Sequence, residues 1–378
     1  MHICFISSEY PLWKSGGVGS FLQTFSGALV KFGHKVSIVG IGDKPEEEQL
    51  DDKGVKIYRL PVSTVPIGKF LFNTNSISKK IEFINLESPV DIVESAELGL
   101  AFIKKNPSIK YVIRLHGGHH FFAESENRKV HWWQGFKEKL SFKKADGFVA
   151  VSQFVKSHTA KYLSYSNKPI EVIYSPINTK LFSPKASIKK QVNNITFVGT
   201  ICEKKGIRQL IMAMELIANK FPDIELNIYG REWYYKDGSS YTEMLRNKYK
   251  DIVDEYVTFH GVIPFEELPE KYALANVCVF PSHMETQGLV AQEAMAMQKP
   301  VVFSKLGPGK EAIKDFETGL LCNPHDIHDI AEKVIWFLDN EDKQLTIIRK
   351  AREFVLNTFN VNACVDKNIL FYQRLIEV

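Results

Sequence analysis

Two glutamates flank the start of a predicted helix between residues 281 and 302, which read PSHMETQGLVAQEAMAMQKPVV. Glu285 lies in the loop after the apolar run 277–280, and Glu293 lies on the helix, which opens at about Gly288. In open α/β sheets, ligands bind outside the carboxyl ends of the strands, and the amides that open a helix bind anions. The amides expected here are those of Gly288, Leu289 and Val290. One carboxylate for a polyol, amides for a phosphate and a second carboxylate for another hydroxyl pair are typical of a nucleotide-sugar site.

A loop with two lysines follows an earlier strand pattern. It reads GTICEKKG, from Gly199 and Thr200 to Lys204, Lys205 and Gly206, and a helical pattern comes directly after it. A lysine in a strand-to-helix loop can neutralise a diphosphate leaving group. Two solvated surface lysines are the alternative interpretation.

A glycine loop, Gly16-Gly17-Val18-Gly19, stands before the first helical pattern. It is not a dinucleotide fingerprint, because the preceding strand ends near Ser7 and the third glycine of that fingerprint is missing. Either it is a flexible loop, or Gly17 belongs to a turn that lets a phosphate or a sugar approach the backbone.

Three histidines follow the strand pattern YVIRL, in the sequence His116-Gly117-Gly118-His119-His120. No carboxylate or thiol in the sequence completes a convincing metal-ligand set around them, so no metal site is predicted. His116 either donates a hydrogen bond to a sugar hydroxyl or a developing charge, or is simply hydrogen-bonded within its loop.

Alternating strand and helix patterns must position these residues. An apolar strand, HICFIS, a helix with apolar residues at helical spacing from Phe21 to Phe32, and the strand KVSIV form a β-α-β unit. Gly33 suits the position that ends the helix. Further strands are predicted at 55–58, 91–93, 111–115, 147–151 and 171–173, which indicates a parallel, doubly wound sheet.

The pattern is interrupted from Ser175 to Asn193 and then restarts with NITFVG, a helix over 206–221 and ELNIYG. The sequence therefore predicts two Rossmann-like domains that face each other across a cleft. We expect an N-terminal acceptor-side domain of residues 1–175 plus about 358–378, and a donor domain of residues 176–357. The amphipathic tail from about Asn362 crosses back to the first domain in this prediction.

Composition favours a soluble globular protein, since 44% of the 378 residues are hydrophobic and 24% are charged. A net charge of +4 does not argue for a nucleic-acid partner. The N-terminus reads as a first strand, and Cys4 and Cys278 fall in apolar strand patterns, which favours buried thiols and a cytoplasmic protein. The aromatic and basic segment 121–144 is either an ordinary half-buried helix or a face that touches the inner side of a membrane.

The chain resembles the retaining, GT-B-fold glycosyltransferases of glycosyltransferase family 4 over nearly its whole length. The similar stretches are SGGVG with its helix, ADGFVAVS, VIYSPINTKLF, VGTICEKKG, VTFHGVIPFEELPEKYALANVCVFPS, and E-x7-E followed by AMAMQKPVV. The resemblance implies that Glu285 contacts the donor sugar and that Glu293 contacts the ribose. It implies that Lys205 and the amides of residues 288–290 hold the diphosphate.

The same resemblance implies roles for residues outside these loops. Gly17 would approach the diphosphate from the other domain, and His116 would lie near the transferred sugar. Val262 and Ile263 would lie beside the base.

Three stretches depart from the family pattern. Thr200 follows Gly199 where the family usually has an arginine, so one of two cations on the diphosphate is missing, and Arg231 is the candidate substitute. The loop that touches the sugar reads E-T-Q-G in place of E-G-F-G, and the linker reads S-P-I-N in place of N-G-V-D.

The function implied is transfer of a hexose from a UDP- or GDP-linked donor to an acceptor hydroxyl in the synthesis of cell-surface polysaccharide, lipopolysaccharide or glycolipid. Neither a metal nor another cofactor is expected, because the sequence has no acidic D-x-D pair and protein groups would neutralise the diphosphate. A GT-B sugar-nucleotide epimerase or hydrolase, and an inactive nucleotide-sugar-binding protein, are the alternatives.

Overall fold

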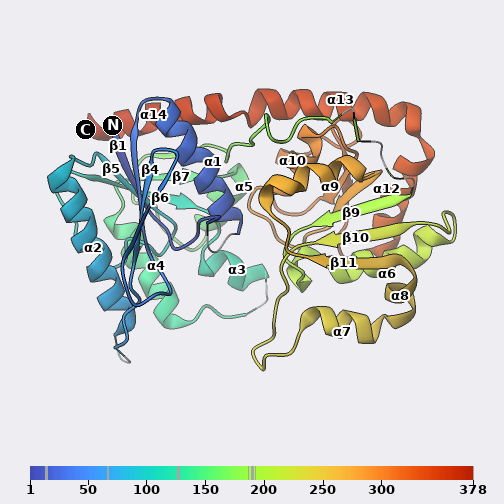
Figure 1. The fold of residues 1–378 in the computed structure, drawn as a ribbon, viewed down its shortest axis with the longest axis horizontal. Coiled ribbons are helices and arrows are strands. Elements are labelled where there is room, and N and C mark those ends of the chain that lie inside the picture. The colour runs from blue at the N-terminus through green and yellow to red at the C-terminus, as the bar shows by residue number, and fades with distance from the viewer. Residues whose placement is uncertain are drawn as a thin grey trace. The chain divides into compact units, whose positions relative to one another are not determined.

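The computed structural model describes residues 1–12, 16–65, 68–125, 128–185, 187–188, 191 and 193–377. Ser15 of the SGGVG loop, residues 126–127 of the aromatic and basic segment and part of the predicted linker lie outside this range. The chain forms two compact units, Met1–Pro176 with Val361–Val378, and Ile177–Asn360 (Figure 1).

The first unit is built on an eight-stranded sheet in the order β3-β4-β2-β1-β5-β6-β7-β8. Its strands are β1 (His2–Ile6), β2 (Lys35–Ile41), β3 (Glu48–Asp52), β4 (Val55–Leu60), β5 (Ile92–Ser95), β6 (Lys110–Leu115), β7 (Gly147–Ala150) and β8 (Ile170–Val172). Its helices are α1 (Gly17–Lys31), α2 (Lys69–Glu87), α3 (His119–Ser125), α4 (Trp132–Lys144), α5 (Gln153–Thr159) and α14 (Val361–Ile376).

The apolar spacing of the first helix pattern produces the expected packing. Phe21 and Phe25 of α1 are buried against Ile3 and Phe5 of β1, and Phe371 of α14 joins the same core. A helix with one apolar stripe gains most of its stability from burying that stripe against a sheet.

One strand corrects the prediction of a purely parallel sheet. Edge strand β3 pairs with β4 in the antiparallel direction, whereas the other pairs of this sheet are parallel. Its sequence, EQLDD, has no apolar run because an edge strand is largely exposed. The turn that joins the two strands has a φ of +53° at Lys53 and +92° at Gly54, which is typical of a tight hairpin.

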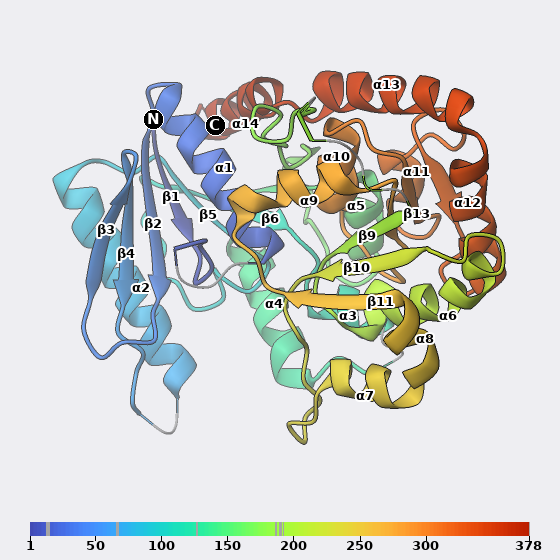
Figure 2. The ribbon, with the colours of Figure 1, turned by 45° about the vertical axis from the view of Figure 1, so that its right-hand side comes forward.

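The second unit has a six-stranded sheet in the order β11-β10-β9-β12-β13-β14, and all its pairs are parallel. Its strands are β9 (Asn194–Val198), β10 (Glu225–Tyr229), β11 (Val257–Gly261), β12 (Val277–Phe280), β13 (Val301–Ser304) and β14 (Leu320–Cys322). Figure 2 shows β9, β10 and β11 side by side. The doubly wound parallel architecture that the sequence predicted is therefore confirmed in both units.

Helices connect the strands of this sheet. They are η1 (Glu203–Lys205), α6 (Ile207–Ala218), α7 (Tyr241–Lys248), α8 (Lys250–Tyr256), η2 (Phe265–Glu267), α9 (Leu268–Leu274), α10 (Leu289–Ala296), α11 (Gly309–Ala312), α12 (Ile327–Asp339) and α13 (Glu341–Thr358).

The last helix, α14, belongs to the first unit through a buried polar network. Arg114 on β6 donates to both oxygens of Glu94 on β5, at 2.7 and 3.1 Å. The same guanidinium donates to Asn368 Oδ1 at 2.6 Å, and the Tyr372 hydroxyl donates to Glu94 Oε2 at 2.6 Å. Further hydrogen bonds offset part of the desolvation cost of a buried ion pair, so α14 contributes to the interior of this unit, although Arg114 Nη1 has no hydrogen-bond partner among the described residues.

Candidate functional site

The site begins where the strand order of the second sheet reverses. From β9 the chain adds β10 and β11 on one side and then β12, β13 and β14 on the other. In this fold class, ligands bind at such a switch point, outside the carboxyl ends of the strands. The Lys205 loop follows β9 and the Glu285 loop follows β12, so both of these predicted residues lie at the switch point.

Lys205 and Glu285 form a direct ion pair, with the ammonium hydrogen-bonded to Glu285 Oε1. The Ser282 hydroxyl donates to the same oxygen at 3.0 Å. Both charged side chains are partly buried, so their attraction is stronger than that of a surface pair. A cation and a carboxylate within reach of one small molecule are what the nucleotide-sugar interpretation requires.

Backbone contacts hold the two loops against each other. The His283 amide donates to the Lys204 carbonyl at 2.9 Å. Gly206 has a φ of +69°, and a β-carbon there would lie only 1.9 Å from the Pro281 carbonyl oxygen. Glycine is therefore required at position 206, both for the backbone conformation and for the close approach of the loops.

Helix α10 starts at Leu289, with Gly288 as its N-cap at a φ of +85°. A β-carbon at Gly288 would lie 2.4 Å from the Phe303 ring, so this position also requires glycine. The N–H groups of a first helical turn have no acceptor within their own helix. The amides of Gly288, Leu289 and Val290 thus open a helix one turn beyond Glu285, where an anion would be stabilised.

Glu293 lies deeper in the second unit than Glu285 does. Its side chain is buried, and the Tyr272 hydroxyl donates to Oε2 at 2.9 Å. Burial raises the pKa of Glu293 to about 8, although the tyrosine bond acts in the opposite direction. The two glutamates of the E-x7-E pattern thus have different partners, and burial favours the protonated form of Glu293 at neutral pH.

Thr200 and Arg231, at the ends of adjacent strands, lie in contact. Arg231 Nε donates to Thr200 Oγ1 at 3.4 Å, and the Ile201 amide donates to the Arg231 carbonyl at 2.9 Å. Arg231 is exposed. Gly199, with a φ of +153°, begins the loop that carries Thr200. The structure thus places a guanidinium beside the threonine that stands where an arginine was expected.

The two predicted base contacts follow strand β11. Val262 is exposed and Ile263 is half-buried. They lie at the same sheet edge as Arg231, since β11 pairs with β10. No hydrogen bond or ring contact ties either side chain to the Lys205 and Glu285 pair among the described residues.

Sequence reasoning missed an aromatic hairpin at this edge. Trp233, Tyr234 and Tyr235 are exposed, and a bridge between Tyr234 and Ser240 closes the hairpin. Another bridge joins Ile201 to Glu232, so the hairpin runs beside the Thr200 loop. The sequence signals were the aromatic run WYY and the turn residues DGSS.

The remaining predicted residues belong to the first unit. Gly17 is the first residue of α1, and a β-carbon there would meet no other atom within 4 Å. The His116 ring lies 5.3 Å from the ring of Phe21 on α1. Burial, helped by the charge of Arg114, lowers the pKa of His116 to about 3, so its ring is neutral at physiological pH.

Two buried carboxylates hold the turn from His116 to His120, and sequence reasoning missed both. Glu97 accepts a hydrogen bond from the Gly117 amide at 2.7 Å. Glu138 on α4 accepts from the His119 amide and pairs with the His120 ring. A β-carbon at Gly118 would lie 2.1 Å from Glu138 Oε1. Neither glutamate has a periodic signature in the sequence, so no local pattern indicated that either is buried.

No group of three or more histidine, cysteine, aspartate or glutamate side chains arranged to hold a metal ion occurs in the described part of the chain. The five cysteines are buried and unpaired, as predicted for Cys4 and Cys278.

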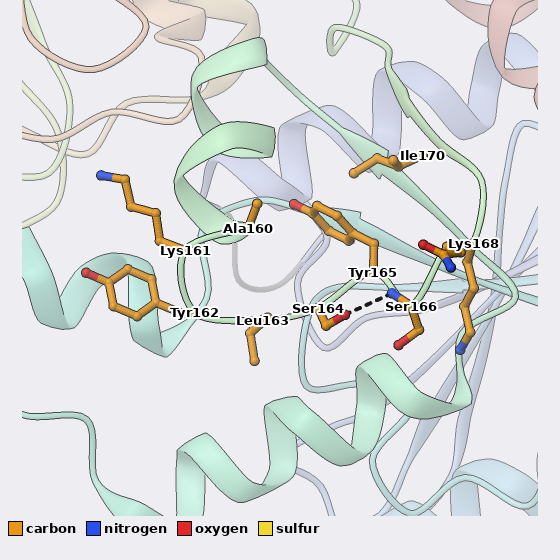
Figure 3. A pocket seen from close by; sticks show the side chains of 10 residues that line it. Ala160, Lys161, Tyr162, Leu163, Ser164, Tyr165, Ser166, Lys168 and Ile170 are labelled. Atoms are coloured by element: carbon orange, nitrogen blue, oxygen red, sulfur yellow. Dashed lines mark hydrogen bonds between the residues drawn. The ribbon is translucent and has the colours of Figure 1, made fainter.

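A surface hollow of about 510 Å³ lies along the loop 160–170 of the first unit (Figure 3). The ring of Tyr162, which lines it, lies 5.7 Å from the His120 ring. One of its two lysines, Lys168, donates to the carbonyls of Phe142 and Lys143 at the end of α4. None of the predicted site residues lines this hollow, so it does not mark the site.

Two family models match consecutive parts of the chain. The model for glycosyl transferases group 1 matches residues 178–354, and the model for glycosyltransferase family 4 matches residues 15–181. The chain belongs to glycosyltransferase family 4. The predicted resemblance is confirmed, and the enzyme is a glycosyltransferase that uses nucleotide-sugar donors.

Relatives of this glycosyltransferase match along nearly their whole length. An uncharacterized glycosyltransferase of Methanocaldococcus jannaschii is 26% identical, over 100% of this chain and 99% of its own. A GDP-mannose-dependent alpha-(1-6)-phosphatidylinositol monomannoside mannosyltransferase of Mycolicibacterium smegmatis is 23% identical, over 87% of each chain.

A solved structure confirms the GT-B fold. The crystal structure of HepE from Anabaena in complex with UDP-glucose superposes with a TM-score of 0.81 at 17% identity, over 99% of this chain and 100% of that one. No helix within the described residues is long and apolar enough to cross a membrane.

Proposed function

We propose that this glycosyltransferase transfers a hexose from a UDP- or GDP-linked donor to an acceptor hydroxyl, with retention of configuration at the anomeric carbon. The observation that carries the proposal is the contact between Lys205 and Glu285 at the switch point of the second sheet. In the donor complex, Lys205 turns to the diphosphate and Glu285 accepts hydrogen bonds from the sugar hydroxyls.

The chemical step separates charge. As the glycosidic bond breaks, positive charge develops on the sugar ring and negative charge on the leaving phosphate. Lys205 and the amides of Gly288, Leu289 and Val290 stabilise that negative charge. Arg231 supplies a second cation in place of the arginine that Thr200 replaces. Attack occurs on the face from which the phosphate leaves, and that phosphate takes the acceptor proton.

The other predicted residues have further roles in this proposal. Gly17 lets the diphosphate approach the backbone, and the neutral His116 ring donates a hydrogen bond to the transferred sugar. Glu293 binds the ribose, and Val262 and Ile263 contact the base. The cations in this scheme are side chains, so we expect transfer to continue when EDTA is added.

The acceptor is proposed to be a growing polysaccharide, a lipopolysaccharide or a glycolipid. The name of the mycobacterial relative supports a lipid-linked acceptor and a GDP-linked donor, whereas the Anabaena complex supports a UDP-linked donor.

Thermal unfolding with a panel of UDP- and GDP-sugars tests the donor. A sugar nucleotide at 100 times its dissociation constant stabilises the folded protein by about 2.7 kcal/mol, which raises the melting temperature by a few degrees. The matching free nucleotide diphosphate and the free sugar are the controls. If no sugar nucleotide of the panel shifts the transition, the proposed donor class is wrong.

Incubation of the labelled donor with and without an acceptor extract separates the alternatives. Turnover that needs the extract and gives an α-linked product from an α-linked donor supports retaining transfer. Fast turnover without extract indicates an epimerase or hydrolase. Binding without any turnover indicates an inactive binding protein, the alternative that Thr200 favours.

A further inference from the structure

Helix α4 presents an unusual outward stripe. Trp132, Phe136, Lys139 and Lys143 are all exposed, and their spacing of four, three and four residues places them on one side of the helix. Trp132 is 74% exposed and Phe136 is 48% exposed. The stripe is therefore aromatic over its first turns and basic over its last.

The start of α2 extends this surface. The Phe70 ring on α2 lies 5.7 Å from that of Phe102, which lies 6.0 Å from the ring of Trp133 on α4. The buried Lys137 ammonium lies 4.2 Å from the centre of the Phe70 ring. The next two residues of α2, Leu71 and Phe72, are 47% and 51% exposed. We call Trp132 and Phe136 the aromatic face.

The exposed charges on α4 and directly before it are basic. Arg128 and Lys129 precede the aromatic face, Lys69 begins the neighbouring helix α2, and all three are exposed. From residue 128 to residue 144 the sequence contains one acid, Glu138. Its side chain is fully buried and faces the His119–His120 turn, so it does not offset these cations at the surface.

The structure also shows which part of the segment 121–144 cannot face a membrane. Phe121 and Phe142 are buried, and so is Lys137. The exposed apolar surface lies instead at the first turns of α4 and, outside that segment, at the first turn of α2. Helix α2 lies between the parallel strands β4 and β5, and helix α4 lies between the parallel strands β6 and β7. Each helix therefore begins at the carboxyl edge of the sheet, the edge that also carries the His116–His120 turn.

We propose that the aromatic face docks on an anionic lipid surface, with the surrounding lysines and Arg128 at the level of the lipid phosphates. Exposed tryptophan and phenylalanine are costly in water and are favoured at the interface between lipid and water. A row of cations beside them is attracted to acidic lipids. A face of this composition fits a membrane surface better than an acidic protein, which would leave these apolar side chains in contact with charged groups.

Docking by α4 also brings the acceptor side of the site to the lipid. The outward stripe of α4 binds the membrane, while Glu138 on its inward side holds the turn that begins with His116. This consequence, unlike the docking itself, rests on the proposed function, because it places a lipid-linked acceptor beside the His116 turn.

Co-sedimentation with vesicles tests the docking on the full chain without a donor. We expect binding to vesicles of phosphatidylcholine with about one-third phosphatidylglycerol, and about tenfold weaker binding to pure phosphatidylcholine. The double variant Trp132→Ser/Phe136→Ser should lose at least about tenfold in binding to the mixed vesicles. The double variant Leu345→Ser/Leu370→Ser is the matched control, since it removes two exposed leucines from α13 and α14, and should bind as the wild type does.

Two outcomes would overturn the proposal. One is equal vesicle binding by the wild type and the Trp132→Ser/Phe136→Ser variant. The other is a wild-type dimer that this variant converts to a monomer, which would make the aromatic face an interface between two copies. Donor binding, measured on the same proteins without vesicles, reports on the proposed function separately and should be unchanged in both double variants.

Discussion

Lys205 and Glu285 are eighty residues apart in the sequence and neutralise each other in the donor-free protein. In the proposed function, the donor replaces this ion pair by two sets of contacts, from the ammonium to the diphosphate and from the carboxylate to the sugar. Of these contacts, only those that become stronger in the transition state raise the rate of the chemical step.

We expect Lys205→Ala and Glu285→Gln each to lower the turnover number at least tenfold, which corresponds to about 1.4 kcal/mol of transition-state stabilisation. Steady-state kinetics with saturating donor measures this. Lys204→Ala is the matched control, because it removes the neighbouring lysine of the same loop. Turnover that falls equally in the Lys204 and Lys205 variants would mean that the loop provides only general positive charge.

Glu293 should link donor binding to pH. Its pKa of about 8 means that it is protonated at neutral pH without a donor. If the ionised carboxylate accepts hydrogen bonds from the ribose, then binding below pH 8 releases a proton and the affinity increases as the pH rises to that value. Calorimetry in buffers of different ionisation enthalpy measures the release. Glu293→Gln should abolish it, and an unchanged release in that variant would rule out this source.

The free energy of unfolding should decrease as the pH rises, whereas the donor affinity should increase. A carboxyl group with a pKa of 4.5 in the unfolded chain and about 8 in the folded one binds more protons in the folded state between these values. Its contribution is fully present below pH 4.5 and is lost as the pH rises through about 8. Glu97, whose pKa burial also raises to about 8, acts in the same sense, so Glu293→Gln should reduce this pH dependence without removing it.

At the scale of elements, the turn from His116 to His120 depends on α4. Glu138→Gln keeps the shape of the side chain but removes the charge that the His119 amide and the His120 ring contact. Because hydrogen bonds to charged groups contribute about 1.5–3 kcal/mol, we expect a loss of that size in the free energy of unfolding. Denaturant unfolding measures it.

A double-mutant cycle with His120→Ala separates this bond from general repacking. A coupling energy of at least about 0.5 kcal/mol between positions 120 and 138 is expected if the pair interacts directly. A coupling near zero would mean that Glu138 stabilises the turn through its backbone contacts alone.

Elements with strong apolar patterns could be predicted from the sequence. Strands β9 and β12 and helices α1 and α10 lie where the runs and spacings placed them, because strands buried on both faces are continuously apolar and a helix that buries one stripe, as α1 does, has helical spacing. Edge strand β3 could not be found in this way, since EQLDD has nothing to bury. Its only signal was the Lys53-Gly54 turn, which was not used.

Contacts between distant elements were not predictable from one sequence. The contact between Arg231 and Thr200 was only a guess until the strand order placed their strands side by side. Glu138 was unnoticed because a buried acid has no periodic signature, and its role follows from the turn that it contacts. Arg114 donates hydrogen bonds to Asn368 and Tyr372, which lie 254 and 258 positions further along the chain. No local pattern encodes such a pairing.

At the scale of the whole molecule, the chain ends in the unit where it began. Most of the proposed donor-binding residues lie in Ile177–Asn360, whereas α14 packs within the other unit. We propose that these two units are separate domains. A defect in α14 should then weaken the first domain and leave the loops after β9 and β12 intact.

Tyr372→Phe is the sharpest test of that separation. It removes the hydroxyl that donates to Glu94 and accepts from Arg114 at 3.3 Å, and it leaves the buried ion pair with fewer hydrogen bonds. We expect a loss of about 1.5–3 kcal/mol in the local stability of the first unit. Hydrogen exchange of the β5 and β6 amides should therefore accelerate, while that of β9 and β12 stays as in the wild type.

Arg374→Ala provides the matched control on the same helix. Arg374 pairs with Glu171 at the surface, and exposed pairs contribute at most about 1 kcal/mol, so exchange should change little. If Tyr372→Phe instead accelerates exchange equally in β6 and β12, then the two units unfold as one. In that case the donor site would depend on α14 through the cooperativity of the whole chain, although none of the predicted donor-binding residues lies on that helix.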